Sequence, residues 1–202
     1  MRIIGICGIS GSGKSYLLQR IKELAPSKIS ILSTDDYYKS RECQQKDKNG
    51  IENFDLPSSI NVEQLIADIN SLRKGDSVSI TKYTFNLIEA KPKIEVVEPS
   101  EILLVEGIFV LAIEELKAQF HNTIFIKSDL NTVLEKRVLR DVAERGMSEE
   151  EVLYQWENHV LPGYKEHVLP YEKNVNSLVY NDHKTDTFVE EIYRELGKNL
   201  LT

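Results

Sequence analysis

The stretch from Gly8 to Ser15, "GISGSGKS", constrains the fold most strongly, because it fits the pattern G-x-x-x-x-G-K-[ST]. The β-branched apolar run "RIIGIC" precedes it and is typical of a buried parallel strand. The segment "KSYLLQRIKEL" follows it and has apolar residues at helical spacing. A strand, a glycine-rich turn and a helix in this order predict a phosphate-binding loop. A Gly/Ser-rich turn without a ligand is the alternative, which the register of the lysine and serine disfavours.

The residue types in this loop suit a nucleotide. Glycines let backbone N–H groups turn toward phosphate oxygens, and the start of the helix adds the positive end of its dipole. We expect Lys14 to reach the terminal phosphates and the Ser15 hydroxyl to bind Mg²⁺. The predicted nucleotide-binding residues are Gly8, Ser10, Gly11, Ser12, Gly13, Lys14, Ser15 and Tyr16. Switch proteins, ATPases and small-molecule kinases share such a loop, so it does not define a reaction.

Strands and helices alternate along the rest of the chain. Further buried strands are predicted in "KISILS", "EILLVEG", "NTIFIKS" and "NSLVYN", and helices in 61–75, 113–120, 129–146, 148–169 and 185–201. This alternation predicts an α/β fold, with a mostly parallel sheet covered by helices on both faces. It is the three-layer α/β/α arrangement of P-loop NTPases.

We expect residues 1–202 to form one domain with two special segments. The alternating runs 77–85 and 93–98 predict a β-hairpin insertion near 77–97, and residues 140–165 predict a lid. Residues 39–60 are polar and predict a loop with short turns. Pro162 is expected to break or bend the second half of the lid.

Composition excludes several classes of protein. The net charge of −7 disfavours a nucleic-acid binder, which needs a basic surface. No apolar run is long enough to span a membrane, and the start of the chain does not resemble a signal peptide. Two cysteines and four unclustered histidines indicate neither a disulfide framework nor a zinc site. A cytoplasmic protein with a small-molecule substrate is therefore expected.

Carboxylates follow two of the predicted strands, where ligands bind in open α/β sheets. We predict Asp35 as the base that orients or deprotonates an acceptor hydroxyl, and as a metal-site residue. Glu106 is predicted to act at the same metal site, through water. Helix capping or turn formation is an open alternative for Asp35, and Asp36 is expected to be solvated or to cap.

Basic residues gather on the helix 129–146. Arg137 and Arg140 lie three residues apart, with Arg137 at the edge of the apolar stripe, and Arg145 follows near the helix end. An arginine that closes over the transferring phosphate can accelerate transfer by about 10³–10⁵. We predict Arg140 and Arg145 as catalytic. A solvated charged face, in which Asp141 and its neighbours pair with the arginines, remains an equal alternative from the residues alone.

Together these motifs resemble the uridine kinase family, within the uridine kinase and phosphoribulokinase group of P-loop kinases, from residue 3 to about 180. The resemblance of "LSTDDYY" implies a catalytic role for Asp35 and an acceptor-pocket aromatic at Tyr38. "NFDLP" resembles the family's sugar-binding motif and implies that role for Asp55. "VEGIF" places Glu106 near the metal, and "RVLRDVAERG" resembles the lid segment that carries the arginines.

The same resemblance assigns the remaining acceptor-binding residues. The predicted set is Tyr38, Asp55, Tyr83, Phe85, Arg137 and Gln155. In an alternating strand Tyr83 and Phe85 point to the same side, so they form an aromatic wall of the pocket, although a core role for one of them stays open. The resemblance implies phosphoryl transfer from ATP or GTP, with Mg²⁺, to the 5′-hydroxyl of uridine or cytidine. It also implies a homo-oligomer, a tetramer or a dimer.

The departures from the family pattern lie on the acceptor side. Ile88 stands where the family has the histidine that reads the pyrimidine, and Ala90 and Met147 replace arginines. An isoleucine cannot hydrogen-bond a base edge. Two alternatives therefore stay open: a kinase of the same group for another ribosyl or polyol acceptor, and a nucleotide-binding regulatory protein that has lost the nucleoside substrate.

Overall fold

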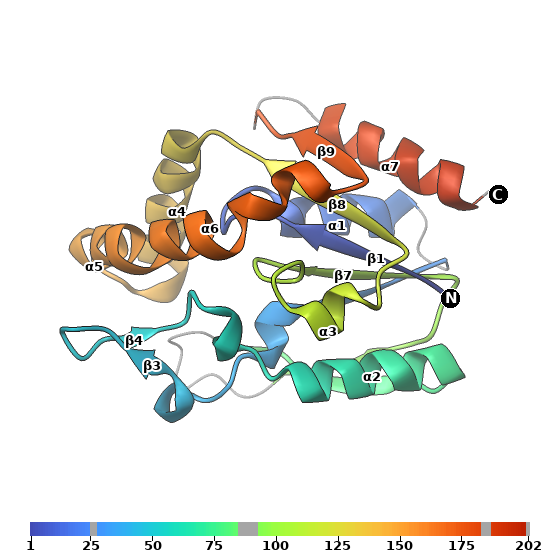
Figure 1. Cartoon of the computed structure of the whole chain (residues 1–202), viewed down its shortest axis with the longest axis horizontal. Coiled ribbons are helices and arrows are strands. Elements are labelled where there is room, and N and C mark those ends of the chain that lie inside the picture. Colours follow the sequence, from blue (N-terminus) through green and yellow to red (C-terminus); the bar gives the residue numbers. More distant parts are fainter. Residues whose placement is uncertain (25–27, 85–92, 183–186, 201–202) are drawn as a thin grey trace.

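The core of the protein is a five-stranded sheet (Figure 1). The computed structural model describes residues 1–24, 28–84, 93–182 and 187–200. Every pair of neighbouring strands in this sheet is parallel, which confirms the predicted α/β class. In spatial order the strands are β2 (Ile29–Ser33), β7 (Ile102–Gly107), β1 (Arg2–Cys7), β8 (Asn122–Lys127) and β9 (Ser177–Tyr180).

Helices cover both faces because alternate strand residues point to opposite sides. In β7, Ile102 and Leu104 join the cluster packed under α1 (Lys14–Leu24) and α7 (Thr187–Leu200). Leu103 and Val105 join the cluster on the other face. There the sheet is covered by α2 (Val62–Lys74), α3 (Glu114–Lys117) and α4 (Leu130–Arg145), as Figure 1 shows. The three-layer arrangement is as predicted.

Local signals in the sequence set the ends of two helices. Asn61 caps α2 by accepting a hydrogen bond from the Gln64 N–H, and Gly75 ends it in a left-handed conformation. The Asp129 side chain caps α4 by accepting from the Thr132 N–H, and Gly146 ends that helix. Both helices therefore end where the sequence predicts.

The predicted helical region after Gly146 consists of three parts. It runs through α5 (Glu149–Gln155), a π-helical turn η4 (Trp156–Val160) and α6 (Leu161–His167), and a 3₁₀ segment η5 (Leu169–Asn174) follows. The irregular turn precedes Pro162 rather than following it. Proline has no N–H to donate to the preceding turn, and a π-bulge accommodates the missing hydrogen bond without ending the helix.

Two small hairpins lie outside the main sheet. Strands β5 (Val78–Thr81) and β6 (Ile94–Val97) pair in antiparallel register, as expected for the insertion. Strands β3 (Gln45–Lys46) and β4 (Glu52–Asn53) form a second pair inside the segment predicted as loop, flanked by 3₁₀ turns η2 (Arg41–Cys43) and η3 (Pro57–Ser59). Two-residue strands are too short for alternation to show in the sequence. In the described parts of the chain, no helix combines the length and apolarity needed to cross a membrane.

Candidate active site

The phosphate loop joins β1 to α1 at the carboxyl edge of the sheet. Gly11 and Gly13 have φ of 89° and 96°, a left-handed conformation that side chains disfavour. The buried Lys14 ammonium donates to the carbonyl oxygens of Gly8 at 2.9 Å and Ile9 at 3.2 Å. The lysine therefore lies along the inside of the loop, with its charge at the center of the turn.

Two buried polar side chains hold this loop from β8 and β9. The carbonyl oxygen of Ser12 accepts from Asn181 Nδ2 at 2.9 Å and from Ser128 Oγ at 3.3 Å. Asn181 follows β9 and Ser128 follows β8, so both come from far along the chain. Sequence reasoning missed them, because an isolated Asn or Ser after a strand carries no signal of its partner. Both hydrogen bonds hold the loop backbone at Ser12.

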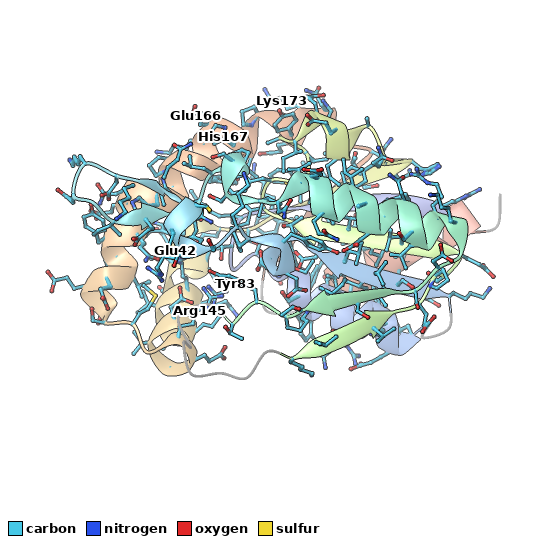
Figure 2. All side chains as sticks on the ribbon, turned by 90° about the horizontal axis from the view of Figure 1, so that it is seen from below. Glu42, Tyr83, Arg145, Glu166, His167 and Lys173 are labelled. Carbon is cyan, nitrogen blue, oxygen red and sulfur yellow. The ribbon has the colours of Figure 1, made fainter. Side chains whose placement is uncertain are left out.

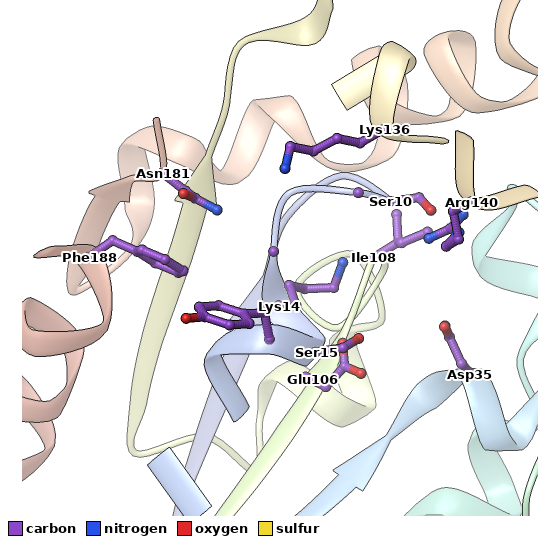
Figure 3. A pocket seen from close by; sticks show the side chains of 13 residues that line it. Ser10, Lys14, Ser15, Asp35, Glu106, Ile108, Lys136, Arg140, Asn181 and Phe188 are labelled. Atoms are coloured by element: carbon purple, nitrogen blue, oxygen red, sulfur yellow. The ribbon is translucent and has the colours of Figure 1, made fainter. Parts of the chain in front are cut away.

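A cavity of about 500 Å³ opens beside the loop (Figure 3). Tyr16 lies at its outer side and its ring stacks on Phe188 at 6.4 Å between centroids. Arg140 lines the cavity from α4, and its buried Nη2 has no hydrogen-bond partner among the described residues. A buried donor facing a cationic loop fits an anionic ligand. The lining residues from the predicted nucleotide site are Ser10, Gly11, Gly13, Lys14, Ser15 and Tyr16.

The predicted metal-site residues face this same cavity (Figure 3). Glu106 is the residue before the last in β7 and is buried, and burial raises the pKa of its carboxyl group to about 7, against the opposing charge of Lys14. The Ser33 hydroxyl donates to Glu106 Oε1 at 2.6 Å. The Ser15 hydroxyl and the Asp35 carboxyl line the cavity as well. Hydroxyl and carboxylate oxygens, with nucleotide phosphates, are the ligands that Mg²⁺ prefers.

These side chains do not form a dense metal cluster by themselves. Within the described ranges, no group of three or more His, Cys, Asp or Glu side chains is placed to hold an ion. This arrangement suits Mg²⁺, which is usually bound by one or two carboxylates together with substrate phosphates. The residues present therefore fit a metal that arrives with the nucleotide.

A second, smaller cavity of about 110 Å³ adjoins the first. Its walls include most of the predicted acceptor residues, namely Tyr38, Asp55, Tyr83, Arg137 and Gln155, together with Met147. Arg145 lines it too, and Figure 2 shows Arg145 and Tyr83 on the same side of the molecule. Ser10, Asp35 and Ile108 line both cavities. Asp35 thus lies at the junction between the two cavities.

Aromatic side chains form one wall of the smaller cavity. The ring of Tyr38 lies 5.3 Å from that of Tyr83 and 5.7 Å from that of Phe54, between centroids. Burial is the main cause that raises the pKa of the Tyr38 hydroxyl. Tyr83 lines this cavity together with Tyr38, so its ring faces the cavity rather than the core. Phe85, Ile88 and Ala90 lie outside the described residues.

Asp55 lies deep in this cavity, where α6 approaches it. The side chain is buried, and burial raises its pKa against the opposing charges of Arg137 and His159. The Asp55 N–H donates to Asn53 Oδ1 at 2.8 Å, which holds the turn after β4. A Cβ atom at Gly163 would lie 2.4 Å from the Asp55 carbonyl oxygen. The packing of Asp55 therefore requires a glycine in α6.

The arginines of α4 gather around one buried carboxylate. Asp141 is fully buried and lies within 3.3 Å of Arg137, 2.8 Å of Arg140 and 3.2 Å of Arg145. The pairing of Asp141 with the arginines agrees with the alternative of a charged face, but the carboxylate and Arg137 are buried, so this face is not solvated there. Arg137 is also buried rather than at the edge of the apolar stripe, and donates to Ser10 Oγ at 3.1 Å and Gln155 Oε1 at 3.3 Å.

Asp36 has a role that the sequence did not suggest. Its side chain is only 7% exposed and pairs with the Lys82 ammonium. Its other oxygen accepts from the Tyr83 N–H at 3.1 Å. The prediction that Asp36 is solvated or caps a helix is therefore wrong, since both carboxylate oxygens bind residues of the insertion hairpin segment. The partner residues lie more than 40 positions away, which local sequence patterns do not reveal.

A second cluster, also missed from sequence, joins the β3–β4 hairpin to the helices beside α4. The Asp47 carboxylate accepts from the Tyr154 hydroxyl at 2.6 Å and lies 2.9 Å from His159 Nε2. The bond from Tyr154 is the main cause that lowers the Asp47 pKa. His159 is buried in η4. This cluster links the two sides of the smaller cavity, because Ile51 and Gln155 line it from either side.

The chain is similar in sequence to a known family of kinases. A model of the phosphoribulokinase / uridine kinase family matches residues 3–187. A uridine kinase of Chlamydia pneumoniae is 30% identical over 201 residues, covering 99% of this chain and 90% of that protein. Uridine-cytidine kinase 2-B of Danio rerio is 32% identical over 187 residues, covering 88% of this chain and 72% of that protein.

Solved structures with the same fold include kinases for other molecules. Phosphoribulokinase from Rhodobacter spheroides has a TM-score of 0.62 at 14% identity, covering 91% of this chain and 72% of that chain. D-glycerate 3-kinase from Cryptococcus neoformans has a TM-score of 0.53 at 16% identity, covering 81% and 78%. At these identities the likeness concerns the fold alone.

Proposed function

Because the chain belongs to the phosphoribulokinase / uridine kinase family, we propose that it is an ATP-dependent kinase that phosphorylates the 5′-hydroxyl of a pyrimidine nucleoside. One observation carries this proposal: Asp35 lines both the cavity beside the phosphate loop and the smaller cavity. A residue that accepts the proton of an acceptor hydroxyl during phosphoryl transfer has to lie at such a junction.

The larger cavity holds the phosphoryl donor in this proposal. Backbone N–H groups of residues 8–15 and the Lys14 ammonium bind the phosphates, and α1 contributes the positive end of its dipole. Arg140 directs its unpartnered Nη2 toward the charge that develops on the transferring group. Ser15, Glu106 and Asp35 are the residues that would hold Mg²⁺, which when bound neutralises phosphate charge.

The smaller cavity holds the acceptor. Tyr38 and Tyr83 stack against its rings, and Asp55 and Gln155 accept or donate hydrogen bonds to the sugar hydroxyls. Asp35 takes the proton of the 5′-hydroxyl as its oxygen forms a bond to the γ-phosphorus. The bond from that phosphorus to the β–γ bridging oxygen breaks, and ADP leaves. Arg137 and Arg145, held by Asp141, stabilise the negative charge near the junction.

The test is a coupled assay of ADP formation with uridine or cytidine, ATP and Mg²⁺. We expect Asp35→Asn to lower kcat by about 10²–10⁴, the usual contribution of general base catalysis, while ATP binding measured by calorimetry is retained. Asp76→Asn, at an exposed position after α2, is the matched control and should keep full activity. Unchanged turnover in Asp35→Asn would remove this residue from the mechanism.

A different ribosyl or polyol acceptor is the second candidate. The observation that favours it is the buried Met147 in the wall of the smaller cavity, where the family has an arginine. The assay therefore includes sugars and sugar alcohols. ADP release with one of these alone would support this candidate. If Ile88 replaces the residue that reads the base, Ile88→His should improve the use of uridine or cytidine, and no gain would mean that the pocket is remodelled more widely or that recognition comes from elsewhere. ATP binding with no acceptor in the panel would indicate a regulatory protein.

We also propose an alternative donor, a cellular location and an oligomeric state. GTP as an alternative donor is consistent with the stacked rings of Tyr16 and Phe188, which offer an apolar surface to a purine. A cytoplasmic location is consistent with the free cysteines Cys7 and Cys43. A homo-oligomer rests on the resemblance to uridine kinases.

A further inference from the structure

The insertion hairpin is held differently at its two ends. At the end near α2, the side chains of Val78, Ile80 and Val97 are buried in the main core. At the other end the ladder of paired residues stops at Thr81, after which a single further bond joins the Lys82 N–H to the Lys93 carbonyl at 2.8 Å. Tyr83 comes directly after this point. Its N–H bonds to Asp36, which lies outside the hairpin.

Asp36 supplies two of those contacts from the 3₁₀ turn η1 (Thr34–Tyr37). One oxygen binds the Lys82 ammonium and the other accepts from the Tyr83 N–H at 3.1 Å. The neighbouring residue in the same turn is Asp35, which lines both cavities. The turn η1 thus carries both Asp35, which lies at the junction of the two cavities, and Asp36, which binds Tyr83 in the wall of the smaller cavity.

We propose that the Asp36–Lys82 ion pair is a positioning element that sets the location of Tyr83 relative to Asp35, and thereby the affinity for the acceptor. This inference rests on the proposed function, because it takes the smaller cavity as the acceptor site. In the described part of the chain, the ion pair contacts Tyr83 and Glu95, which belong to the insertion hairpin and the segment that follows β5. Its direct contacts therefore lie on the acceptor side, and its main effect is expected on the affinity for the acceptor.

The burial of the pair makes it sensitive to the loss of one partner. The side chain of Asp36 is 7% exposed and that of Lys82 is 37% exposed. A mostly buried carboxylate that loses its cation is strongly destabilised, whereas removing both charges together is tolerated much better. Glu95 lies 3.7 Å from the Lys82 ammonium across the hairpin, so Lys82 keeps a weaker partner when Asp36 is changed. The two residues are thus expected to be energetically coupled.

The experiment is a double-mutant cycle with Asp36→Asn and Lys82→Met. Each single variant should raise the KM for the acceptor about tenfold, which corresponds to about 1.4 kcal/mol of lost binding, with kcat and the KM for ATP within about twofold of wild type. The double variant should be no worse than the poorer single variant, because the interaction is lost only once. An additive double variant, or an equal rise in both KM values, would overturn the proposal.

The control pair is Lys127–Glu172, an ion pair of 2.7 Å with one mostly buried carboxylate on another part of the surface. Lys127→Met and Glu172→Gln should leave the KM for the acceptor unchanged. If these variants raise it as much as the Asp36 variants do, the effect is general destabilisation and the positioning role is refuted.

A second readout does not depend on the acceptor's identity. In Asp36→Ala the Tyr83 amide loses its acceptor, so hydrogen exchange of residues 78–84 should become faster while that of β7 stays unchanged. Asp36→Asn keeps an oxygen for this bond but loses the ion pair with Lys82, so its exchange rate should lie between those of wild type and Asp36→Ala. If no acceptor is phosphorylated by the wild type, the proposed function fails, yet the exchange result still tests the positioning. Unchanged exchange in Asp36→Ala would overturn it.

Discussion

The carboxyl group of Glu106 lies near the buried end of β7, where burial destabilises its charge and where it lines the cavity beside the phosphate loop. Burial raises its pKa to about 7, because water no longer solvates the ionised form. Lys14 opposes this shift, and the Ser33 hydroxyl donates a hydrogen bond to the same group. Asp35, which also lines the cavity, adds a like charge that raises the pKa further. A nucleotide-bound cation would relieve this repulsion.

Glu106→Gln should therefore stabilise the nucleotide-free protein at alkaline pH. The carboxyl group has a pKa of 4.5 in the unfolded chain and about 7 in the folded protein. The free energy of unfolding therefore falls as pH rises from 4.5 through about 7, because the folded protein solvates the ionised carboxylate poorly. The variant has no such charge, so we expect it to be more stable than wild type by on the order of 1–3 kcal/mol at pH 8, and equally stable below pH 4.5. Denaturant unfolding at several pH values measures this.

The same variant should lose most of its turnover, because the predicted metal-site carboxylate is gone. Glu101→Gln, an exposed substitution just before β7, is the control and should change neither stability nor turnover. A Glu106→Gln protein that is less stable than wild type at pH 8 would contradict the role assigned to burial.

At the scale of elements, the smaller cavity, which we propose holds the acceptor, is lined by residues from several separate segments of the chain. Tyr38 follows η1, Asp55 follows β4, Tyr83 follows β5, and Gln155 ends α5. Partly buried hydrogen bonds to Asp36 and Asp47 hold the two hairpins in place. The close approach of α6 to Asp55 at Gly163 completes one side. Small changes in these contacts are expected to affect acceptor binding before they affect the sheet.

Gly163→Ala tests that approach. The new Cβ would lie 2.4 Å from the Asp55 carbonyl oxygen, so α6 or the turn carrying Asp55 must shift. We expect a loss of about 1–3 kcal/mol of stability and a raised KM for the acceptor, with the KM for ATP unchanged.

Gly197→Ala is the matched control in α7, where a Cβ meets open space. It should leave both KM values unchanged and stabilise the protein by up to about 1 kcal/mol, because alanine favours helix more than glycine. Equal KM values for wild type and Gly163→Ala would show that Asp55 tolerates a shift of α6.

At the scale of the whole molecule, the strand order places the functional groups together. The sequence β2-β7-β1 brings the end of β2 with Asp35, the end of β7 with Glu106 and the loop after β1 to one edge of the sheet. Parallel strands present all their carboxyl ends on the same side, which is why the two cavities adjoin there. The helices α1 and α7 line the larger cavity, α5 lines the smaller one, and α4 contributes side chains to both.

Binding of the donor should therefore stabilise the whole fold. At about 100 times its Kd, MgATP is expected to add about 2.7 kcal/mol, which for a chain of this size raises Tm by about 5–10 °C. Lys14→Ala should remove most of this rise, because the charge inside the phosphate loop is lost. Lys74→Ala, an exposed change at the end of α2, should keep the full rise. Scanning calorimetry with and without MgATP measures the effect, and a full rise in Lys14→Ala would refute the assigned donor site.

Local patterns in the sequence determined the elements and the donor side of the site. The loop from Gly8 to Ser15 and the caps at Asn61 and Gly75 act through near neighbours in the chain. The positions of Asp35 and Glu106 at the carboxyl ends of β2 and β7 follow from the strand pattern. Such signals are readable because the physics that sets them, backbone conformation and strand alternation, extends over only a few residues. Family resemblance extended the prediction to Asp55 and Gln155, whose cavity the structure then describes.

Only the tertiary structure decided which residues far apart in the chain form ion pairs and hydrogen bonds with each other. Asp141 became the buried center of three arginines, Asp36 joined the insertion hairpin and Asn181 supported the phosphate loop. Each of these contacts depends on burial, which makes an unpaired polar group costly and so selects its partner in space rather than in sequence. The sequence by itself determined which groups are available for phosphoryl transfer, and the packing of the layers decided which of them meet.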